Sequence, residues 1–165
     1  MIGPFTRAQF WNLGIVGGVG ILMATGIFIE HVQALAPCPL CLMQRIWFMI
    51  IGVIGCAALA HGSDRAAYPV LGIVAALIGG GFSVRQLWLQ SLPADQVPSC
   101  GPDLEYMLEV FPLSEILIAM TSGTGDCAKV VWTMLGLNIP GWALVGFTGL
   151  IVVSVLQIRS VGATE

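Results

Sequence analysis

The sequence changes from polar to apolar at Cys38-Pro39-Leu40-Cys41-Leu42-Met43-Gln44-Arg45, and the apolar character then continues to about Ala60. Pro39 suits the first turn of a helix, where its missing N–H is not needed. If a helix begins there, Cys41 and Arg45 lie four residues apart on one of its faces. A helix N-terminus and a nearby cation both favour the thiolate form of a cysteine. The stretch therefore predicts a redox-active thiol pair at the start of a long apolar helix.

The composition of the chain indicates a membrane protein. Of its 165 residues, 57% are hydrophobic and 9% are charged, whereas soluble proteins have about a quarter of their residues charged. The length is that of a single domain, residues 1–165. A net charge of -3 with no basic run argues against a nucleic-acid partner.

The apolar residues gather in four ranges, each long enough to cross a hydrocarbon core of about 30 Å. A long segment rich in proline and acidic residues, about 89–141, joins the last two and is expected to carry short helices at 104–108 and 113–120, the second lying along the membrane surface. We therefore predict an all-α membrane protein, a four-helix bundle with a long polar loop. The expected spans are 10–29, 42–60, 68–88 and 142–158.

The basic residues predict the orientation. Arg7, Arg65 and Arg159 flank the spans on the side of the two chain ends, whereas the long loop holds only Lys129. The positive-inside rule puts the chain ends in the cytoplasm. Four of the five cysteines then lie outside, in a compartment where disulfides persist.

The cysteines outside the membrane are Cys38, Cys41, Cys100 and Cys127, which allow three pairings. Proximity favours Cys38–Cys41 and leaves Cys100–Cys127. Both bridges can be structural, and a four-thiolate zinc site is a further alternative, although no metal is expected because the second pair lacks zinc-knuckle spacing. Cys56 is too far along its helix to reach another cysteine, and we expect it to be buried and inert.

Two cysteine pairs on one side of a membrane favour an electron relay by thiol–disulfide exchange. The sequence contains no haem, flavin or second metal motif to accept the electrons, so a lipid-soluble quinone is expected by elimination. Arg45, early in the second span, and Arg85, late in the third, lie at similar depth. Ionisable residues inside spans are functional candidates.

The chain resembles the DsbB family, the bacterial inner-membrane quinone reductases that reoxidise the periplasmic thiol oxidase DsbA. The resemblance covers nearly the whole chain. It rests on Glu30-His31, Cys38-Pro39-Leu40-Cys41, Gln44-Arg45, Arg85-Gln86-Leu87, Cys100, Gly123 to Cys127, and Gly136-Leu137-Asn138-Ile139-Pro140-Gly141-Trp142. It implies a four-helix bundle with a mobile periplasmic loop, a DsbA-like partner, and ubiquinone or menaquinone as the electron acceptor.

By this resemblance, the partner's thiolate attacks Cys100, which then carries the mixed disulfide. Cys127 is released and joins Cys38, and Cys41 becomes the thiolate that faces the quinone. Arg45 supports that thiolate and the quinone oxygen.

Gln44 and Arg85 are further expected quinone contacts. The chain departs from some family members at Ser91, where they carry a histidine, and at Gln44, where they carry an acid.

Two other functions fit parts of the pattern. A VKOR-like oxidoreductase also combines cysteines, helices and quinone, but its C-x-x-C lies in a late span. A non-enzymatic membrane protein with structural disulfides would not need Arg45 one turn beyond Cys41.

Overall fold

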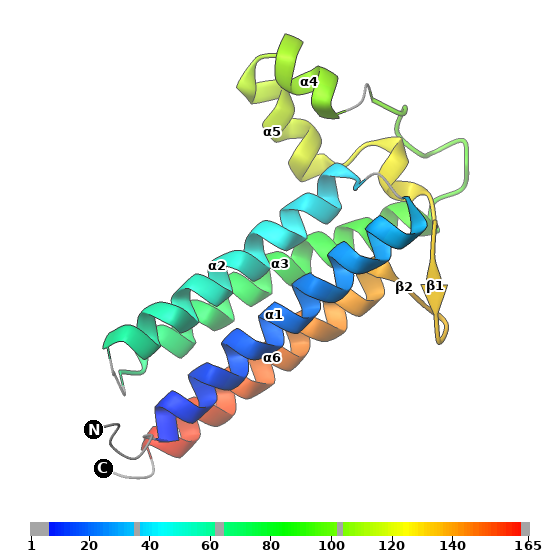
Figure 1. The fold of residues 1–165 in the computed structure, drawn as a ribbon. Helices are drawn as coiled ribbons and strands as arrows, with labels where there is room; N and C mark the ends of the chain where they lie inside the picture. Colours follow the sequence, from blue (N-terminus) through cyan, green and yellow to red (C-terminus); the bar gives the residue numbers. More distant parts are fainter. Residues whose placement is uncertain (1–6, 35–36, 62–64, 102–103, 163–165) are drawn as a thin grey trace.

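Four long helices pack side by side as a bundle (Figure 1). The computed structural model describes residues 7–34, 37–61, 65–101 and 104–162. Each long helix contains one of the expected spans and is long and apolar enough to cross a membrane. The prediction of an all-α membrane protein with four spanning helices is confirmed. The helices are α1 (Arg7–Gln33), α2 (Pro39–His61), α3 (Ala67–Ser91) and α6 (Ile139–Gly162).

Local sequence explains where three of these helices begin or end. The first turn of α2 closes when the Leu42 N–H donates to the Cys38 carbonyl at 3.2 Å, with proline at the first helical position. Helix α3 ends at Ser91, and the next residue, Leu92, is extended because a proline follows it. Helix α6 is capped by Asn138, whose Oδ1 accepts the Gly141 N–H at 3.0 Å.

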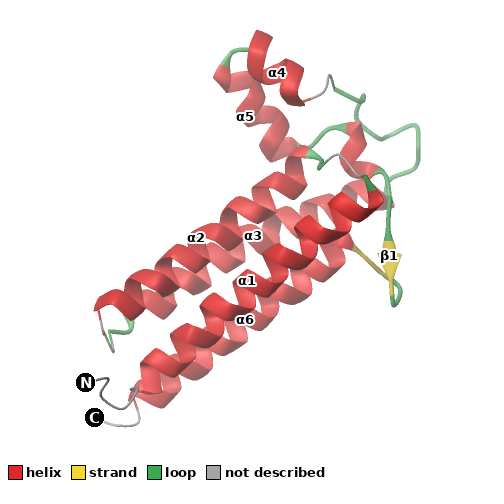
Figure 2. Cartoon of the chain, viewed as in Figure 1, coloured by secondary structure: helices red, strands yellow, loops and turns green. Residues whose placement is uncertain are grey.

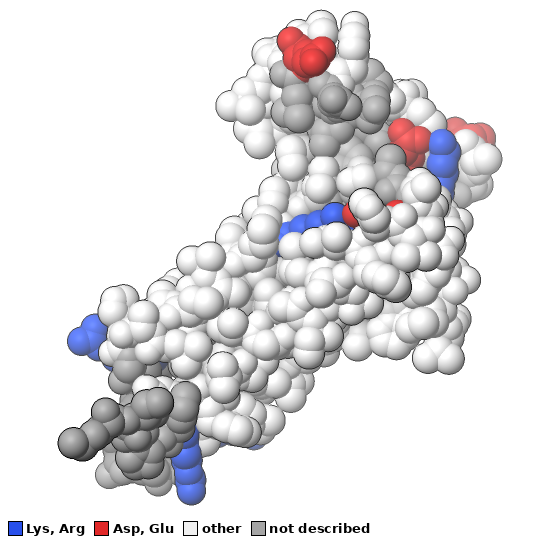
Figure 3. All heavy atoms as spheres, viewed as in Figure 1, with Lys and Arg blue, Asp and Glu red and all other residues white. Residues whose placement is uncertain are grey.

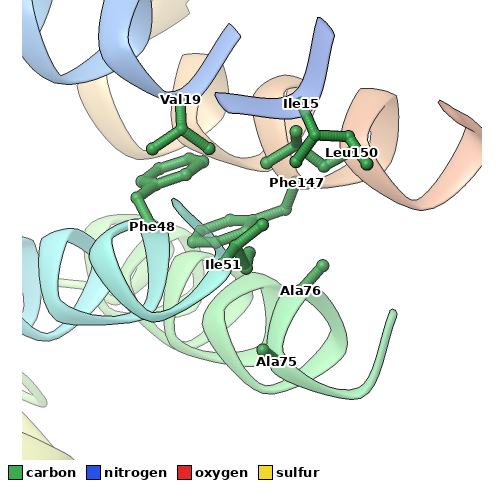
Figure 4. Close-up of a cluster of buried hydrophobic side chains, with 8 residues drawn as sticks. All are labelled: Ile15, Val19, Phe48, Ile51, Ala75, Ala76, Phe147 and Leu150. Carbon is green, nitrogen blue, oxygen red and sulfur yellow. The ribbon is translucent and has the colours of Figure 1, made fainter. Parts of the chain in front are cut away.

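The core of the bundle lies where all four helices meet (Figure 4). Phe48 of α2 and Phe147 of α6 stack with ring centroids 3.9 Å apart. A Cβ added to Gly79 of α3 would lie 2.4 Å from the Phe147 ring, so only glycine allows this approach. Gly79 thus allows α3 to pack closely against α6.

The segment between α3 and α6 carries the remaining elements (Figure 2). The helices α4 (Leu104–Val110) and α5 (Leu113–Ser122) confirm the expected short helices. A 3₁₀ helix, η1 (Gly125–Ala128), and a hairpin of β1 (Thr133–Met134) and β2 (Leu137–Asn138) were not expected. The hairpin pairs Thr133 with Asn138 and turns at two residues of positive φ. The expected position of α5 on the membrane surface stays a prediction.

Charged side chains lie mainly at the two ends of the molecule (Figure 3). In this view the acidic residues gather at the end that carries α4 and α5, and the flank of the bundle is almost uncharged. The long helices expose large apolar side chains, such as Phe10, Ile21, Val53 and Val84, as expected of helices that face lipid.

Cys56 is exposed on α2, so the prediction that it is buried was wrong. In a membrane bundle the lipid-facing residues are as apolar as the buried ones, and the sequence of α2 does not distinguish the two faces.

Candidate redox site

The redox site begins at the N-terminus of α2. The Cys38 Sγ and the Cys41 Sγ lie 2.8 Å apart, within hydrogen-bond distance, and the Cys41 backbone N–H donates to the Cys38 Sγ at 3.4 Å. Both cysteines are partly buried, and all five cysteines are free thiols in this structure. Amides of the first helical turn have no partner within the helix, so a sulfur atom is well placed to accept from one of them.

A third sulfur lies against the same helix end. Cys127, in η1, is fully buried with Leu40 and Leu89. Its thiol is hydrogen-bonded to that of Cys38, and its sulfur also accepts the Leu40 backbone N–H. Cys38 therefore contacts both Cys41 and Cys127, which the sequence separates by 86 residues.

The electrostatics of these sulfurs differ. The hydrogen bond from Cys38 lowers the pKa of Cys127 to about 6, with smaller contributions from the Leu40 and Thr124 backbone amides, and burial opposes the shift. The pKa of Cys38 is raised by its hydrogen bonds to Cys127 and then to Cys41. At neutral pH, Cys127 is thus the thiolate and Cys38 the protonated donor beside it.

Cys100 is the exposed member of the group. Its segment packs on η1 so closely that a Cβ on Gly125 would lie 3.2 Å from the Cys100 Sγ. The Asp126 carboxylate accepts hydrogen bonds from Lys129, at 2.8 Å, and from Cys100, and Lys129 is the main reason that the pKa of Asp126 is lowered. The structure therefore holds Cys100 beside the turn that carries Cys127, with its own sulfur open to solvent.

Two buried amides complete the surroundings of the α2 cysteines. The Gln86 Nε2, from α3, lies 3.3 Å from both the Cys38 Sγ and the Cys41 Sγ. Its Oε1 accepts the Gln44 Nε2 at 2.8 Å. Gln86 was not identified as a site residue from the sequence, although an uncharged polar residue inside an apolar span is a signal for contact between helices.

Two cavities meet at Cys41. The first, which we call the loop cavity, has a volume of about 270 Å³ and is lined by Glu30, Cys38, Cys41, Gln86 and residues of the 124–132 segment. The second, the bundle cavity, has a volume of about 300 Å³ and lies between α1, α2, α6 and the hairpin. It is mostly apolar. Its lining includes Leu22, Met23, Ile29, Phe48, Trp132 and Trp142, together with Cys41, Gln44 and Arg45.

The two arginines predicted for the site have different surroundings. Arg45 lines the bundle cavity, and its guanidinium forms an ion pair with Glu30 of α1. Arg85 instead donates through Nε to the Ser122 carbonyl at 3.3 Å and lies over the Trp88 ring at 4.5 Å. The structure thus brings Arg45 and Gln44 together with Cys41, whereas Arg85 joins α3 to α5.

Within the described part of the chain, no group of three or more His, Cys, Asp or Glu side chains is arranged to hold a metal ion. The contacts made by these sulfurs are those of thiol–disulfide exchange, which needs one sulfur within reach of two others.

Comparison with known proteins identifies the family. The family model described as disulfide bond formation protein DsbB matches residues 7–157. Proteins named disulfide bond formation protein B are 54% identical over 131 residues in Hahella chejuensis (78% of this chain, 79% of that protein) and 52% identical over 146 residues in Marinobacter nauticus (86% and 87%). Disulfide bond formation protein B 1 of Pseudomonas aeruginosa is 41% identical over 152 residues (90% and 93%). The resemblance seen in the sequence is confirmed, and this chain belongs to the DsbB family of disulfide bond formation proteins.

Proposed function

We propose that this disulfide oxidoreductase reoxidises a DsbA-like thiol oxidase in the periplasm and passes the electrons to a membrane quinone. The observation that carries the proposal is the position of Cys38, which contacts Cys127 of the loop and Cys41, itself exposed to the bundle cavity. A chain of three sulfurs then connects the exposed Cys100 segment with a cavity between the spanning helices.

The first step is exchange with the partner. The partner's thiolate attacks Cys100 of a Cys100–Cys127 disulfide, because Cys100 is the exposed sulfur and Cys127 is buried. The Cys100–Cys127 bond breaks and Cys127 leaves as a thiolate. The amide donors to Cys127 from Leu40 and Thr124 do not depend on the redox state of Cys38, so they can support this leaving group.

The second step moves the electrons to α2. Cys127 attacks Cys38 of a Cys38–Cys41 disulfide, so the Cys38–Cys127 bond forms and Cys41 leaves as a thiolate. The partner's second thiol then attacks the partner's own sulfur in the mixed disulfide with Cys100. This step releases the oxidised partner and leaves Cys100 as a free thiol. Cys100 next attacks Cys127, which restores the loop disulfide and leaves Cys38 and Cys41 as a dithiol. One dithiol in the partner has become one dithiol on α2, so the electrons balance.

The bundle cavity supports a quinone as the final acceptor. Its volume is at the lower end of the range for ligand pockets, its lining is apolar, and Arg45 is the only charged side chain among the described residues that line it. A quinone bound there would accept two electrons and two protons as Cys38 and Cys41 reform their disulfide. Arg45 would orient a quinone oxygen, with Gln44 beside it. Arg85 is proposed as a further quinone contact, although in this structure it donates to the Ser122 carbonyl and does not line the bundle cavity. Ubiquinone and menaquinone both fit this chemistry.

The direct test uses the purified full-length protein, a reduced DsbA-type partner and a water-soluble quinone, followed by quinone absorbance. We expect wild type to reduce the quinone and Cys38→Ala and Cys100→Ala to be inactive. Partner oxidation without quinone consumption would overturn the quinone assignment.

We also propose that the protein lies in the bacterial inner membrane with cytoplasmic chain ends. The positions of Arg7, Arg65 and Arg159 support this orientation. A reporter fused after Glu165 should be active only in the cytoplasm, and periplasmic activity would reverse the orientation.

A further inference from the structure

Gln86 has a side chain that contacts both members of the α2 cysteine pair. It lies late in α3 and is 3% exposed. Its Nε2 is 3.3 Å from each of the two sulfurs, and its Oε1 is 3.6 Å from the Cys41 Sγ. One amide therefore has an N–H donor for a Cys41 thiolate and a carbonyl acceptor for a Cys41 thiol.

Gln44 determines which way this amide is oriented. The Gln44 side chain is also 3% exposed, and its Nε2 donates to the Gln86 Oε1 at 2.8 Å. Because an amide oxygen only accepts and an amide nitrogen only donates, this bond directs the Gln86 N–H groups toward the sulfurs. With Gln44 oriented as in this structure, a flipped Gln86 would place two N–H donors against each other in a buried site, which is costly.

The cation expected to stabilise Cys41 is occupied elsewhere. Arg45 is one helical turn beyond Cys41, but its guanidinium forms an ion pair with Glu30. Among the hydrogen bonds of the described residues, the side-chain N–H donor to Cys41 is that of Gln86. A thiolate in a partly buried site needs a donor, since burial without one favours the protonated form.

We propose that Gln86 is a catalytic hydrogen-bond donor to the Cys38–Cys41 pair and that Gln44 is the positioning residue behind it. This inference rests on the proposed function and assigns a role within the same site. When Cys127 attacks Cys38, the Cys38–Cys41 bond breaks and its electron pair goes to the Cys41 sulfur. The Gln86 N–H stabilises that leaving thiolate, and the Gln44–Gln86 bond keeps the N–H pointed at it.

The test compares Gln86→Met with Gln157→Met in the full-length protein. Methionine matches glutamine in length but provides no N–H donor. Gln157 is a suitable control because it is a second buried glutamine of the bundle, 2% exposed, whose Nε2 donates to the Asn12 Oδ1 at 3.1 Å, away from the sulfurs. The first readout is the alkylation rate of Cys41 at pH 7 in the fully reduced protein, measured by isotopic labelling and peptide mass spectrometry.

Gln86→Met should slow Cys41 alkylation at least about tenfold, because a hydrogen bond to an ionised group changes an equilibrium by at least that factor. It should also shift the dithiol–disulfide equilibrium of Cys38–Cys41 against dithiothreitol about tenfold toward the disulfide, since the reduced state loses its donor. Gln157→Met should stay within about twofold of wild type in both measurements, because it is distant from the sulfurs. Equal alkylation in wild type and Gln86→Met, or an equal decrease in both variants, would overturn the proposal.

Two further variants keep the test informative if Gln86→Met folds poorly. Gln86→Asn keeps a buried amide but withdraws it by one methylene, and it should also slow Cys41 alkylation; a wild-type rate in this variant would contradict the inference. Gln44→Met should have a smaller effect and add nothing in the Gln86→Met background, because Gln44 acts through Gln86. Additive effects would refute the positioning role. None of these readouts uses quinone, so failure of the quinone assignment would be seen separately, in wild-type turnover.

Discussion

Gly125→Ala should separate Cys100 from the turn that carries Cys127. The added Cβ would lie 2.4 Å from the Pro98 carbonyl oxygen, 3.0 Å from the Cys100 nitrogen and 3.2 Å from the Cys100 Sγ. The first contact is about 1 Å shorter than an ordinary one and involves backbone, which no side-chain rotation can relieve. The 98–100 segment must therefore move away from η1.

Overpacking of this kind costs about 1–3 kcal/mol. Because the displaced segment carries one of the two sulfurs, we expect the cost to weaken the Cys100–Cys127 disulfide by at least about tenfold, which corresponds to about 1.4 kcal/mol. The assay is a glutathione redox titration with differential alkylation and peptide mass spectrometry, which reports the Cys38–Cys41 pair separately. That pair should titrate as in wild type.

Gly101→Ala is the matched control for this change. Among the described residues, its Cβ would meet only side-chain atoms of Thr124, the nearest at 3.2 Å, and no backbone atom. The control should titrate within about twofold of wild type, since a flexible neighbour absorbs the contact. If Gly125→Ala also titrates within this range, Cys100 does not depend on close packing against η1, and the reasoning is refuted.

Three further predictions concern Arg45, Cys127 and Cys56. Arg45→Met should lower quinone reduction at least about tenfold and raise the KM for quinone, with little change in Tm, whereas Arg45→Lys should restore activity only in part because it lacks the planar fork; turnover equal to wild type would mean that Arg45 only pairs with Glu30. In the fully reduced protein the alkylation rate of Cys127 should fall about tenfold per pH unit below pH 6, because its lowered pKa keeps the thiol ionised down to that pH. A midpoint near pH 8.5, the value of an ordinary thiol, would show that the hydrogen bond from Cys38 does not lower the pKa of Cys127. Cys56→Ala should keep wild-type turnover in the quinone assay, because Cys56 faces outward from α2; inactivity in a folded Cys56→Ala protein would show that this face takes part in the reaction.

The helices could be predicted because a membrane imposes a length on them. The apolar runs that become α1, α2, α3 and α6 are long and nearly uncharged, and the prolines at 39 and 93 mark where α2 begins and where α3 has ended. The C-x-x-C at the start of α2 was equally clear. All of these features are set by residues that are close together in the sequence, so the sequence alone predicts them.

The missing parts depend on contacts between distant segments. Cys56 is exposed although the sequence predicts it to be buried, because burial in lipid and burial in protein select the same residues. The pairing of Arg45 with Glu30 and of Gln86 with the cysteines needs the packing of α1 and α3 on α2, which no spacing within one helix reveals. The β1–β2 hairpin was missed because its strands are two residues long, too short to show an alternating pattern.

The central claim is that Cys127 passes electrons to Cys38, and a Cys41→Ser variant tests it most directly. In this variant Cys38 has no partner on α2, and its sulfur contacts that of Cys127. Cys38 should therefore attack Cys127 in the loop disulfide and release Cys100 as a free thiol. Peptide mapping without reduction should find Cys38 linked to Cys127; an intact Cys100–Cys127 disulfide with Cys38 as a free thiol, or a Cys38–Cys100 link, would contradict the relay.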